Sequence, residues 1–473
     1  MRAVQMSAVI VGVLLLTLGA LAAFYWLAAF LGVAAEALFG PGYAYVGTSI
    51  ANVVTLILVV VMVIASLLTV AERKWSSMMQ DRIGPNRARL AIIPGLRNRP
   101  LGGIPHFMAD GLKMLTKEDV VPAQVSRLLY SAAPMISFGS VFVLFAVVPV
   151  GPTLAASDIP GIASIAGAWG VDPSFPVALT VAPNLEIGLL YVFAMAGIAV
   201  YGTSLAGWAS NNKLALLGGV RAASQMISYE IALGLSLVGC MMAYGSLQLE
   251  EMTLDQGRGL FGGVLPAWGI FLQPYGFLLF FAAAFAETKR APFDVPEGES
   301  EVVGYFVEYS GMRFGLFMIS EFVEIVVLSA LLAAIFLGGY QLPVPPAWGL
   351  EAWITANWGA GVLALLQGLS FMVKLAVLVW LQLLIRWSLI RIRFDQMQTL
   401  GWKILLPLAL ANIVVTGVLI LADRSLTLLA IVGIAELLLM IGITALYRAP
   451  QPGTVRYAGQ PAARVAASSG HGH

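Results

Sequence analysis

Ten apolar runs along this 473-residue chain are each long enough to cross a membrane. The hydrocarbon core of a bilayer is ~30 Å thick, so a helix needs about 20 residues to cross it. Lipid offers no partners to backbone N–H and C=O groups, and such runs are therefore expected to be helical. The sequence predicts an all-α polytopic membrane protein of about ten transmembrane helices. The expected spans are 8–31, 50–71, 128–150, 185–208, 224–244, 269–287, 315–338, 362–386, 402–422 and 426–447.

The composition excludes several classes of function. A net charge of +1 provides no overall basic field for nucleic acid. The chain has one cysteine, Cys240, and three histidines, His106, His471 and His473. These are too few to ligate an iron–sulfur cluster or a bis-histidine haem, and no metal site is expected. Any electrons must therefore travel on a partner protein or a diffusible molecule.

The first apolar run has two interpretations. Val33, Ala34 and Ala35 resemble a signal-peptide cleavage site. However, the run is too long for the apolar region of a signal peptide and only Arg2 precedes it. A retained transmembrane helix is the expected outcome.

The distribution of basic residues predicts the orientation. If the N-terminus is cytoplasmic, all but three of the 26 basic residues fall in cytoplasmic connections or in the termini. The exceptions are Arg258, Arg424 and Lys374. This pattern follows the positive-inside rule and places both termini in the cytoplasm.

The connection between Arg73 and Arg127 is expected to hold an interfacial amphipathic helix. Phe107, Met108, Leu112 and Leu115 follow a helical period, and Pro122 would end the helix. Seven basic residues precede it, so an ordinary lipid-headgroup anchor is an equally simple interpretation.

The connection from Glu287 to Arg313 is unusually acidic for a protein in which 11% of residues are charged. A carboxylate held near low dielectric has a raised pKa and exchanges protons at ordinary pH. Pro292 and Pro296 prevent a regular helix at its start. Apolar residues alternate with the acids, which favours burial against a partner over a solvated loop. The acids are Glu287, Asp294, Glu297, Glu299, Glu301 and Glu308.

Ionisable residues also lie within the expected spans. Each costs at least ~2.5 kcal/mol to insert at the bilayer centre, so a partner or a hydrated cavity is expected. One interpretation is a structural ion pair, such as Lys374 with Glu230 or Glu321. The other is a chain of proton-exchanging groups, which better explains five such sites. They are Glu72, Glu230, Glu321, Glu324 and Lys374.

Five ordered sequence blocks resemble the H subunit (subunit 1) of proton-pumping NADH:quinone oxidoreductase, respiratory complex I. The resemblance covers roughly residues 52–422. The blocks are AERKWSSMMQDRIGPNR, ADGLKMLTKEDVVP, GWASNNKLALLGGVRAASQMISYE, ETKRAPFDVPEGESEVVGYFVEYSGMRF and RIRFDQMQTLGWKILLPLAL.

The resemblance implies a subunit of the bacterial plasma (inner) membrane that has eight family helices and no catalytic residue or covalent cofactor of its own. It implies quinone as the bound substrate, with iron–sulfur clusters, flavin and NADH on partner subunits. The implied partners are the quinone-reducing peripheral subunits, the antiporter-like membrane subunits and membrane lipid.

The resemblance and the positions of the charged residues together predict roles for individual residues. Those of the quinone chamber would be Glu72, Arg73, Arg82, Arg87, Asp294 and Arg313. Those of the proton path and its coupling to the chamber would be Glu230, Glu287, Glu297, Glu299, Glu301, Glu308 and Glu321, joined by Glu324 and Lys374 because these two lie inside expected spans.

The chain also departs from the family pattern. Residues 1–49 and 423–448 would each add a transmembrane helix to a quinone-chamber domain at 50–422, and residues 449–473 are expected to be a mobile tail. The stretch from Ala88 to Ile104 is longer than usual, His106 stands where many members have Gln, and the loop 151–184 is expanded.

Two rival functions remain at this point. The nearer is the homologous subunit of a membrane-bound hydrogenase or a ferredoxin-driven complex, with the same acidic machinery and a different electron partner. The more distant is a free-standing proton or cation transporter. The sequence shows no inverted repeat, which argues against the transporter.

Overall fold

The computed structural model describes residues 2–89, 101–298, 301–302 and 304–446. Among these residues, nine helices are long and apolar enough to cross a membrane. Two of these nine helices contain a π-helical segment. In the first, α2 (Ala44–Asn52) continues through the π-helical residues Val53–Val61 into α3 (Met62–Met79). Likewise α15 (Phe394–Thr399) continues through Leu400–Leu405 into α16 (Leu406–Ala422). The other seven are α1 (Arg2–Phe39), α5 (Arg127–Leu144), α7 (Gly188–Ala209), α8 (Lys213–Tyr244), α12 (Gly311–Phe336), α14 (Ala360–Ser388) and α17 (Thr427–Leu446).

The sixth expected span, 269–287, is broken and is not among these nine helices. It forms α10 (Gly269–Leu272) and the 14-residue α11 (Pro274–Glu287). Pro274 lacks a backbone N–H and disfavours the helical conformation of the residue before it, and Gln273 is accordingly non-helical, with φ −140° and ψ 57°. Its buried side chain contacts Thr416 and Asn412 of α16 instead. The expected architecture is thus confirmed as an all-α membrane fold, with one interrupted span.

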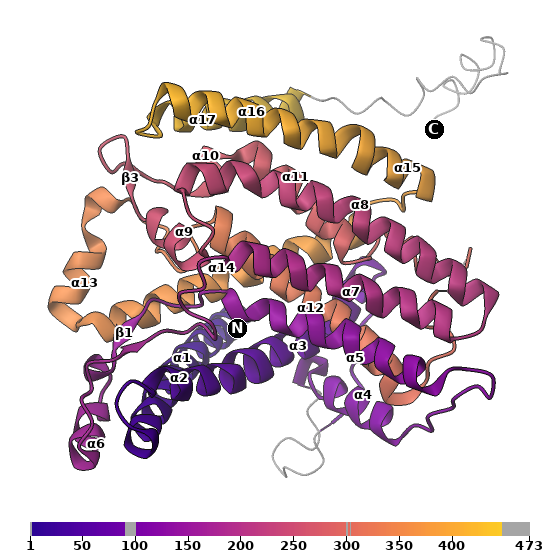
Figure 1. Cartoon of the computed structure of the whole chain (residues 1–473), viewed down its shortest axis with the longest axis horizontal. Coiled ribbons are helices and arrows are strands. Elements are labelled where there is room, and N and C mark those ends of the chain that lie inside the picture. The colour runs from indigo at the N-terminus through magenta and orange to yellow at the C-terminus, as the bar shows by residue number, and fades with distance from the viewer. Residues whose placement is uncertain (1, 90–100, 299–300, 303, 447–473) are drawn as a thin grey trace.

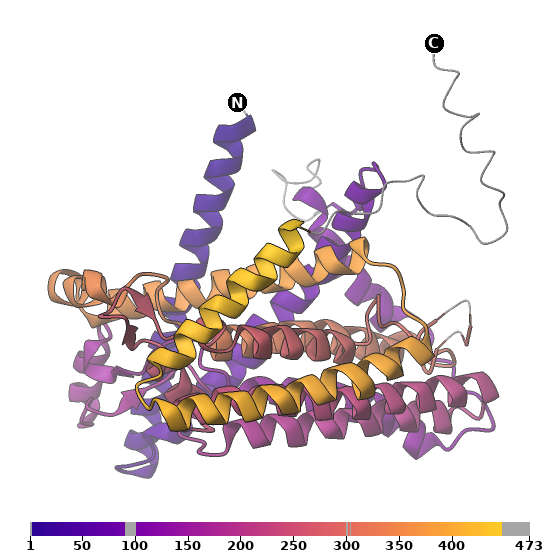
Figure 2. The ribbon, with the colours of Figure 1, turned by 90° about the horizontal axis from the view of Figure 1, so that it is seen from above.

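Helix α12 occupies the centre of the bundle. Nearly all its side chains from Ser320 onward are buried, and it packs against α3, α5, α11 and α14. Helices α5, α7 and α8 form a second group beside it, and α16 and α17 lie along α8, α10 and α11 (Figure 1). Figure 2 shows that α1 crosses the long direction of this bundle steeply, with its N-terminal end projecting away.

Short elements gather at the two ends of the bundle (Figure 1). Two small antiparallel hairpins pair β1 (Leu154–Ala155) with β2 (Pro176–Val177) and β3 (Gly259–Leu260) with β4 (Leu265–Pro266). They share one end with α6 (Ile162–Trp169), α9 (Leu249–Asp255) and α13 (Leu350–Trp358), whereas α4 (Pro105–Thr116) lies at the other.

The amphipathic helix is present as α4 but ends earlier than predicted. Its last residue is Thr116 rather than a residue next to Pro122, because the following chain turns extended and the Val120 N–H donates to Ser310 Oγ at 2.8 Å. Met108, Leu112 and Leu115 form an exposed apolar stripe on α4. Phe107 instead lines a small cavity against α3 and α12, so the four residues do not share one face.

Two glycines of α17 provide a matched test of how this helix packs against α10. A Cβ at Gly433 would lie 2.1 Å from the carbonyl oxygen of Phe271, whereas one at Gly442 would meet nothing within 4 Å. We therefore expect Gly433→Ala to displace α17 from α10 and lower the melting temperature of the purified protein. Gly442→Ala should be neutral or stabilising, because alanine gains up to ~1 kcal/mol over glycine in a helix. Equal melting temperatures for the two variants would contradict this packing.

Candidate functional site

The acidic connection between α11 and α12 folds back against the bundle. Gln225 of α8 is fully buried, and its side-chain amide donates to the carbonyls of Ala286, at 2.7 Å, and Phe293, at 2.9 Å. These two bonds fix both ends of the turn that carries Lys289 and Arg290. Both basic side chains are consequently buried, with relative exposures of 3% and 6%.

Arg290 is the centre of a buried charge network. Its Nη1 lies 2.8 Å from Glu72 on α3, and its Nη2 lies 3.2 Å from Glu321 on α12. The guanidinium also stacks over the ring of Phe322, 4.1 Å from the centroid. Arg386 of α14 forms a second ion pair with Glu72. Buried charges are tolerated when they are paired and hydrogen-bonded in this way.

A second pair continues the network deeper into the bundle. Lys289 Nζ lies 3.3 Å from Glu324, and both side chains are almost fully buried. Burial alone would lower the pKa of Lys289, but Glu324, Glu321 and Glu287 raise it above its ordinary value, so the lysine stays charged. Glu287 interacts electrostatically with Glu324 and Lys289, and also with Glu230 of α8.

Glu297 and Tyr305 complete the network from the loop. Glu297 is hydrogen-bonded to Glu321, and burial together with that neighbouring carboxylate raises its pKa well above the ordinary value. A proton held between the two carboxyl groups accounts for their close approach. The Tyr305 hydroxyl donates to Glu321 at 3.5 Å. Glu321 is therefore contacted by an arginine, an acid and a phenol.

Asp294 is the carboxyl group of the loop best placed to titrate near neutral pH. Burial raises its pKa from 3.8 to about 6, assisted by Glu321 and opposed by Arg391, Arg386 and Arg290. A carboxyl whose pKa is raised on folding binds more protons in the folded state, so its contribution to stability falls as pH rises from about 4 to 6.

This shift gives a pH-dependent prediction for Asp294→Asn. The asparagine variant should be more stable than the parent above pH 6 and should approach it near pH 4, where the aspartate is protonated. The expected difference at pH 7 is on the order of 2 kcal/mol. Melting temperatures of the purified protein from pH 4 to 8 measure it, and parallel curves for the two proteins would contradict the assignment.

Three adjoining cavities surround the network. The first has a volume of about 260 Å³ and is lined by charged residues, including Glu72, Arg290 and Glu321, and by Phe314, Phe317 and Met318. A second, of about 410 Å³, shares Glu72 and Arg73 with it and reaches Arg82 and Trp387. A third, of about 90 Å³, lies between α4 and the bundle and also includes Arg73. Together they extend from the α3–α4 connection to the charged network.

The remaining predicted loop acids do not join the network. Glu301 pairs with Arg221 at 2.8 Å and with Arg391 at 3.7 Å, and Glu308 accepts a hydrogen bond from Asn212 at 2.7 Å. The described part of the loop forms turns rather than a helix, so its acids are not aligned on one face. Glu299 lies outside the described residues.

Of the predicted chamber residues, Glu72, Arg73 and Arg82 line the cavities, whereas Arg87, Asp294 and Arg313 do not. Arg73 pairs with Asp110 of α4 at 2.6 Å, and the Arg82 Nε donates to Gln80 at 2.7 Å. Arg87 is exposed. Arg313 pairs with Asp119 at 3.3 Å and lies over the ring of Tyr130, outside the three cavities.

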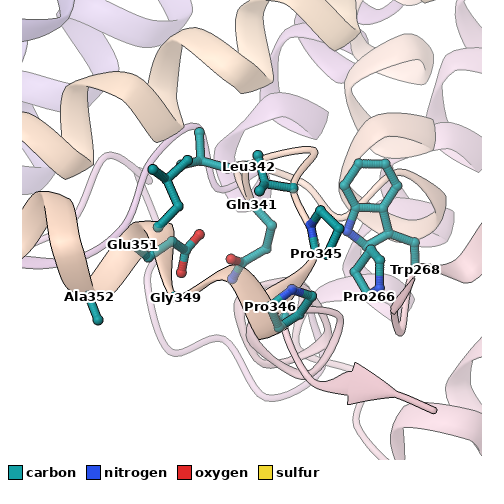
Figure 3. A pocket seen from close by; sticks show the side chains of 12 residues that line it. Pro266, Trp268, Gln341, Leu342, Pro345, Pro346, Gly349, Glu351 and Ala352 are labelled. Atoms are coloured by element: carbon teal, nitrogen blue, oxygen red, sulfur yellow. The ribbon is translucent and has the colours of Figure 1, made fainter. Parts of the chain in front are cut away.

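Lys374 lies at the other end of α12, away from the carboxylates. Its ammonium donates to the carbonyls of Gly339, at 2.9 Å, and Gln341, at 2.6 Å, and lies over the ring of Trp268. The structure therefore does not pair it with Glu230 or Glu321. Figure 3 shows the pocket of about 260 Å³ next to this site, where Gln341, Trp268 and Glu351 line the wall.

These contacts predict a structural role for Lys374 that differs from proton transfer. Lys374→Met should remove the ammonium from the buried Gly339 carbonyl and leave the Gln341 carbonyl with the Ser370 hydroxyl as its donor, at 3.1 Å. We expect this to destabilise the chain by roughly 1–3 kcal/mol. Lys374→Arg keeps the charge but not the compact three-donor geometry, and should be intermediate. Melting temperature of the purified protein and proton transport by vesicles that contain it separate the two roles. A loss of transport at unchanged stability would favour a place in the proton path.

Sequence reasoning misses the basic half of this site, because it treats Lys289, Arg290 and Arg386 only as orientation signals. The available signal is the direct succession of Glu287, Lys289 and Arg290 at the end of an apolar run, where the cations neutralise the acids. Glu436, half-buried on α17, is a further carboxylate within an apolar helix that sequence reasoning does not single out.

Comparisons with known proteins agree with this architecture. The family model described as NADH dehydrogenase matches residues 51–417. An NADH-quinone oxidoreductase H subunit of Cytophaga hutchinsonii is 38% identical over 78% of this chain and 96% of its own length. The H subunit of Bdellovibrio bacteriovorus is 39% identical over 74% of this chain and 90% of its own, and subunit 8 of Rhodothermus marinus is 38% identical over 76% and 93%. The chain thus belongs to the NADH dehydrogenase family.

Proposed function

We propose that this chain is the H-type membrane subunit of an NADH-quinone oxidoreductase, which forms the quinone-access chamber and couples quinone reduction to proton translocation. The Cytophaga and Bdellovibrio relatives carry that subunit name and are matched nearly end to end. The proposal places the protein in the bacterial plasma membrane with both termini in the cytoplasm, following its basic-residue distribution.

The cavity beside Arg290 is the observation that carries this proposal. Ligand pockets typically combine apolar walls with a few convergent polar groups. Here Phe314, Phe317 and Met318 provide the apolar wall, and Arg73 and Arg290 provide donors. This combination suits a quinone, whose ring and prenyl tail are apolar and whose carbonyl oxygens accept hydrogen bonds. In this role the chain supplies no redox centre and binds quinone as a substrate.

The charge network offers a physical route for coupling. Glu230, Glu287, Glu324, Glu321 and Arg290 follow one another in electrostatic contact from α8 to the cavity. A change of charge at the cavity therefore alters the protonation of the next carboxyl group, because such interactions are strong at low dielectric. We place Glu297 and Asp294 at the cavity end of this route. Glu301 and Glu308, paired at the outer side of the loop, would face the peripheral arm.

The proposed partners follow from the same assignment. Iron–sulfur clusters, flavin and NADH would reside on peripheral subunits that dock beside α4 and the acidic loop. Antiporter-like membrane subunits would receive the electrostatic signal from the Glu230 end of the network. Lipid surrounds the apolar outer faces of the described helices.

Purification through an affinity tag on this chain tests the proposal. Membranes would be solubilised in mild detergent, the companions identified by mass spectrometry, and the preparation assayed for iron and NADH:quinone reduction. Co-purifying iron–sulfur and antiporter-like subunits with quinone reductase activity is the expected result. Iron with hydrogenase or ferredoxin activity would assign the chain to the related complexes instead. A lone chain without iron, from membranes in which complexes survive, would overturn the proposal.

A further inference from the structure

A cavity of about 350 Å³ lies near the end of the bundle that carries α6, α9 and α13, opposite to the end that carries α4. It lies between α1, the segment 154–160 and the start of α14. Tyr25, Leu154, Ile159 and Leu365 make up much of its wall. None of these residues contributes to the charge network.

Three contacts around this cavity fix the positions of the elements that form its walls. Helix α1 approaches α14 closely at Leu21, since a Cβ on Gly368 would lie 3.1 Å from the Leu21 side chain. The buried Tyr25 hydroxyl donates to the carbonyl of Pro152 at 2.7 Å and holds the following segment across α1. Gly361 of α14 faces the carbonyl of Asp158, 3.6 Å from its Cβ position. The cavity is an open groove, the space that remains between these three contacts.

The groove is apolar and opens beside two helices that are long and apolar enough to span a membrane. Trp358 and Val362 at its rim are 59% and 37% exposed. Tryptophan is enriched at the level of lipid headgroups, where its ring is amphipathic. In a bilayer, an apolar groove beside two such helices would be open to lipid, and its volume of about 350 Å³ is at the lower end of the range for small-ligand sites. One acyl chain is the occupant that fits both properties.

The charge at the rim selects the headgroup. Asp158 is the charged residue among those lining the cavity; it is exposed, and Trp358 lines the same cavity. A cation held between a carboxylate and an indole ring gains from both. An anionic headgroup would instead meet a negative surface, because the connections at this end hold two basic residues, Arg258 and Arg424, against eight acids. The acids are Asp158, Asp172, Glu186, Glu250, Glu251, Asp255, Glu351 and Asp423.

We propose that this groove binds one zwitterionic phospholipid, with an acyl chain between α1 and α14 and its ammonium group at Asp158 and Trp358. The N-terminal helix, which the family model does not cover, thereby forms a lipid site with a helix that it does cover. The site is independent of the proposed role in quinone chemistry.

Photolabelling of the protein tests this site, purified in mild detergent together with any companions that it retains. The preparation would be reconstituted with a phosphatidylethanolamine that carries a diazirine on one acyl chain, irradiated and mapped by peptide mass spectrometry. We expect labelling of peptides from both α1 and the start of α14. Unlabelled phosphatidylethanolamine should compete with the label, and phosphatidylglycerol should compete roughly two- to fivefold less effectively.

Two substitutions with matched controls test separately the site of the acyl chain and the contact with the headgroup. Leu365→Trp fills the groove and should abolish labelling there, whereas Val414→Trp adds the same bulk to the exposed face of α16 and should not. Asp158→Asn should remove the preference for phosphatidylethanolamine, whereas Asp172→Asn at the same end should retain it. Labelling that is unchanged in Leu365→Trp, or equal competition by both lipids in the parent, would overturn the proposal.

Discussion

Arg290→Met is expected to be the most damaging single substitution in the described part of the chain. Methionine fills much of the space but leaves Glu321 without its cation in a buried position. Glu72 keeps Arg386 and is less affected. Breaking a buried ion pair from one side typically costs about 3–5 kcal/mol. We therefore expect a large fall in the amount of assembled complex in membranes and loss of its quinone reductase activity.

A second-site change and a control sharpen this test. Arg290→Met combined with Glu321→Gln removes the unpaired charge, so the amount of complex should recover while activity stays low. Arg221→Met provides the matched control, since Arg221 pairs with Glu301 at 2.8 Å but the two side chains are 23% and 42% exposed. Such pairs contribute roughly 0.2–1 kcal/mol. Equal losses in Arg290→Met and Arg221→Met would contradict the buried network.

Glu230→Gln should produce the second large effect, on coupling rather than on assembly. Glu230 is half-buried on α8 beside Gly197 and joins the network through its electrostatic interaction with Glu287. Glutamine has nearly the same shape as glutamate but cannot exchange a proton. We expect coupled quinone reduction and proton pumping to fall by about tenfold or more, since positioned proton-transfer groups typically contribute ~10²–10⁴-fold. Proton uptake by vesicles and NADH oxidation, measured together, report this.

Glu436→Gln is the control for that experiment. Glu436 is also half-buried in an apolar helix, but it lies on α17, outside both the family match and the network. Its variant should pump normally. Normal activity and pumping in Glu230→Gln, at parental levels of complex, would remove Glu230 from the proposed path.

The spans could be predicted because apolar run length and helix length are set by the same bilayer thickness. The break at Gln273 is harder to predict, although Pro274 is a signal for it, because a proline is tolerated in some membrane helices. The apolar period predicts helix α4 but not its end, since Ser310 accepts the Val120 N–H from 190 residues away.

The sequence by itself determined the fold class and the family and singled out the candidate acids, because each depends on local composition and on ordered motifs. Only the tertiary structure decided which of these acids lie together. Glu72, Glu321 and Arg290 are brought into contact by three separate elements, and Glu301, close to Glu297 in sequence, faces a different partner. Likewise, Lys374 resembles a member of the proton path in sequence but caps carbonyls beyond the end of α12. The reason is physical: charge interactions decay with distance through space and are indifferent to separation along the chain.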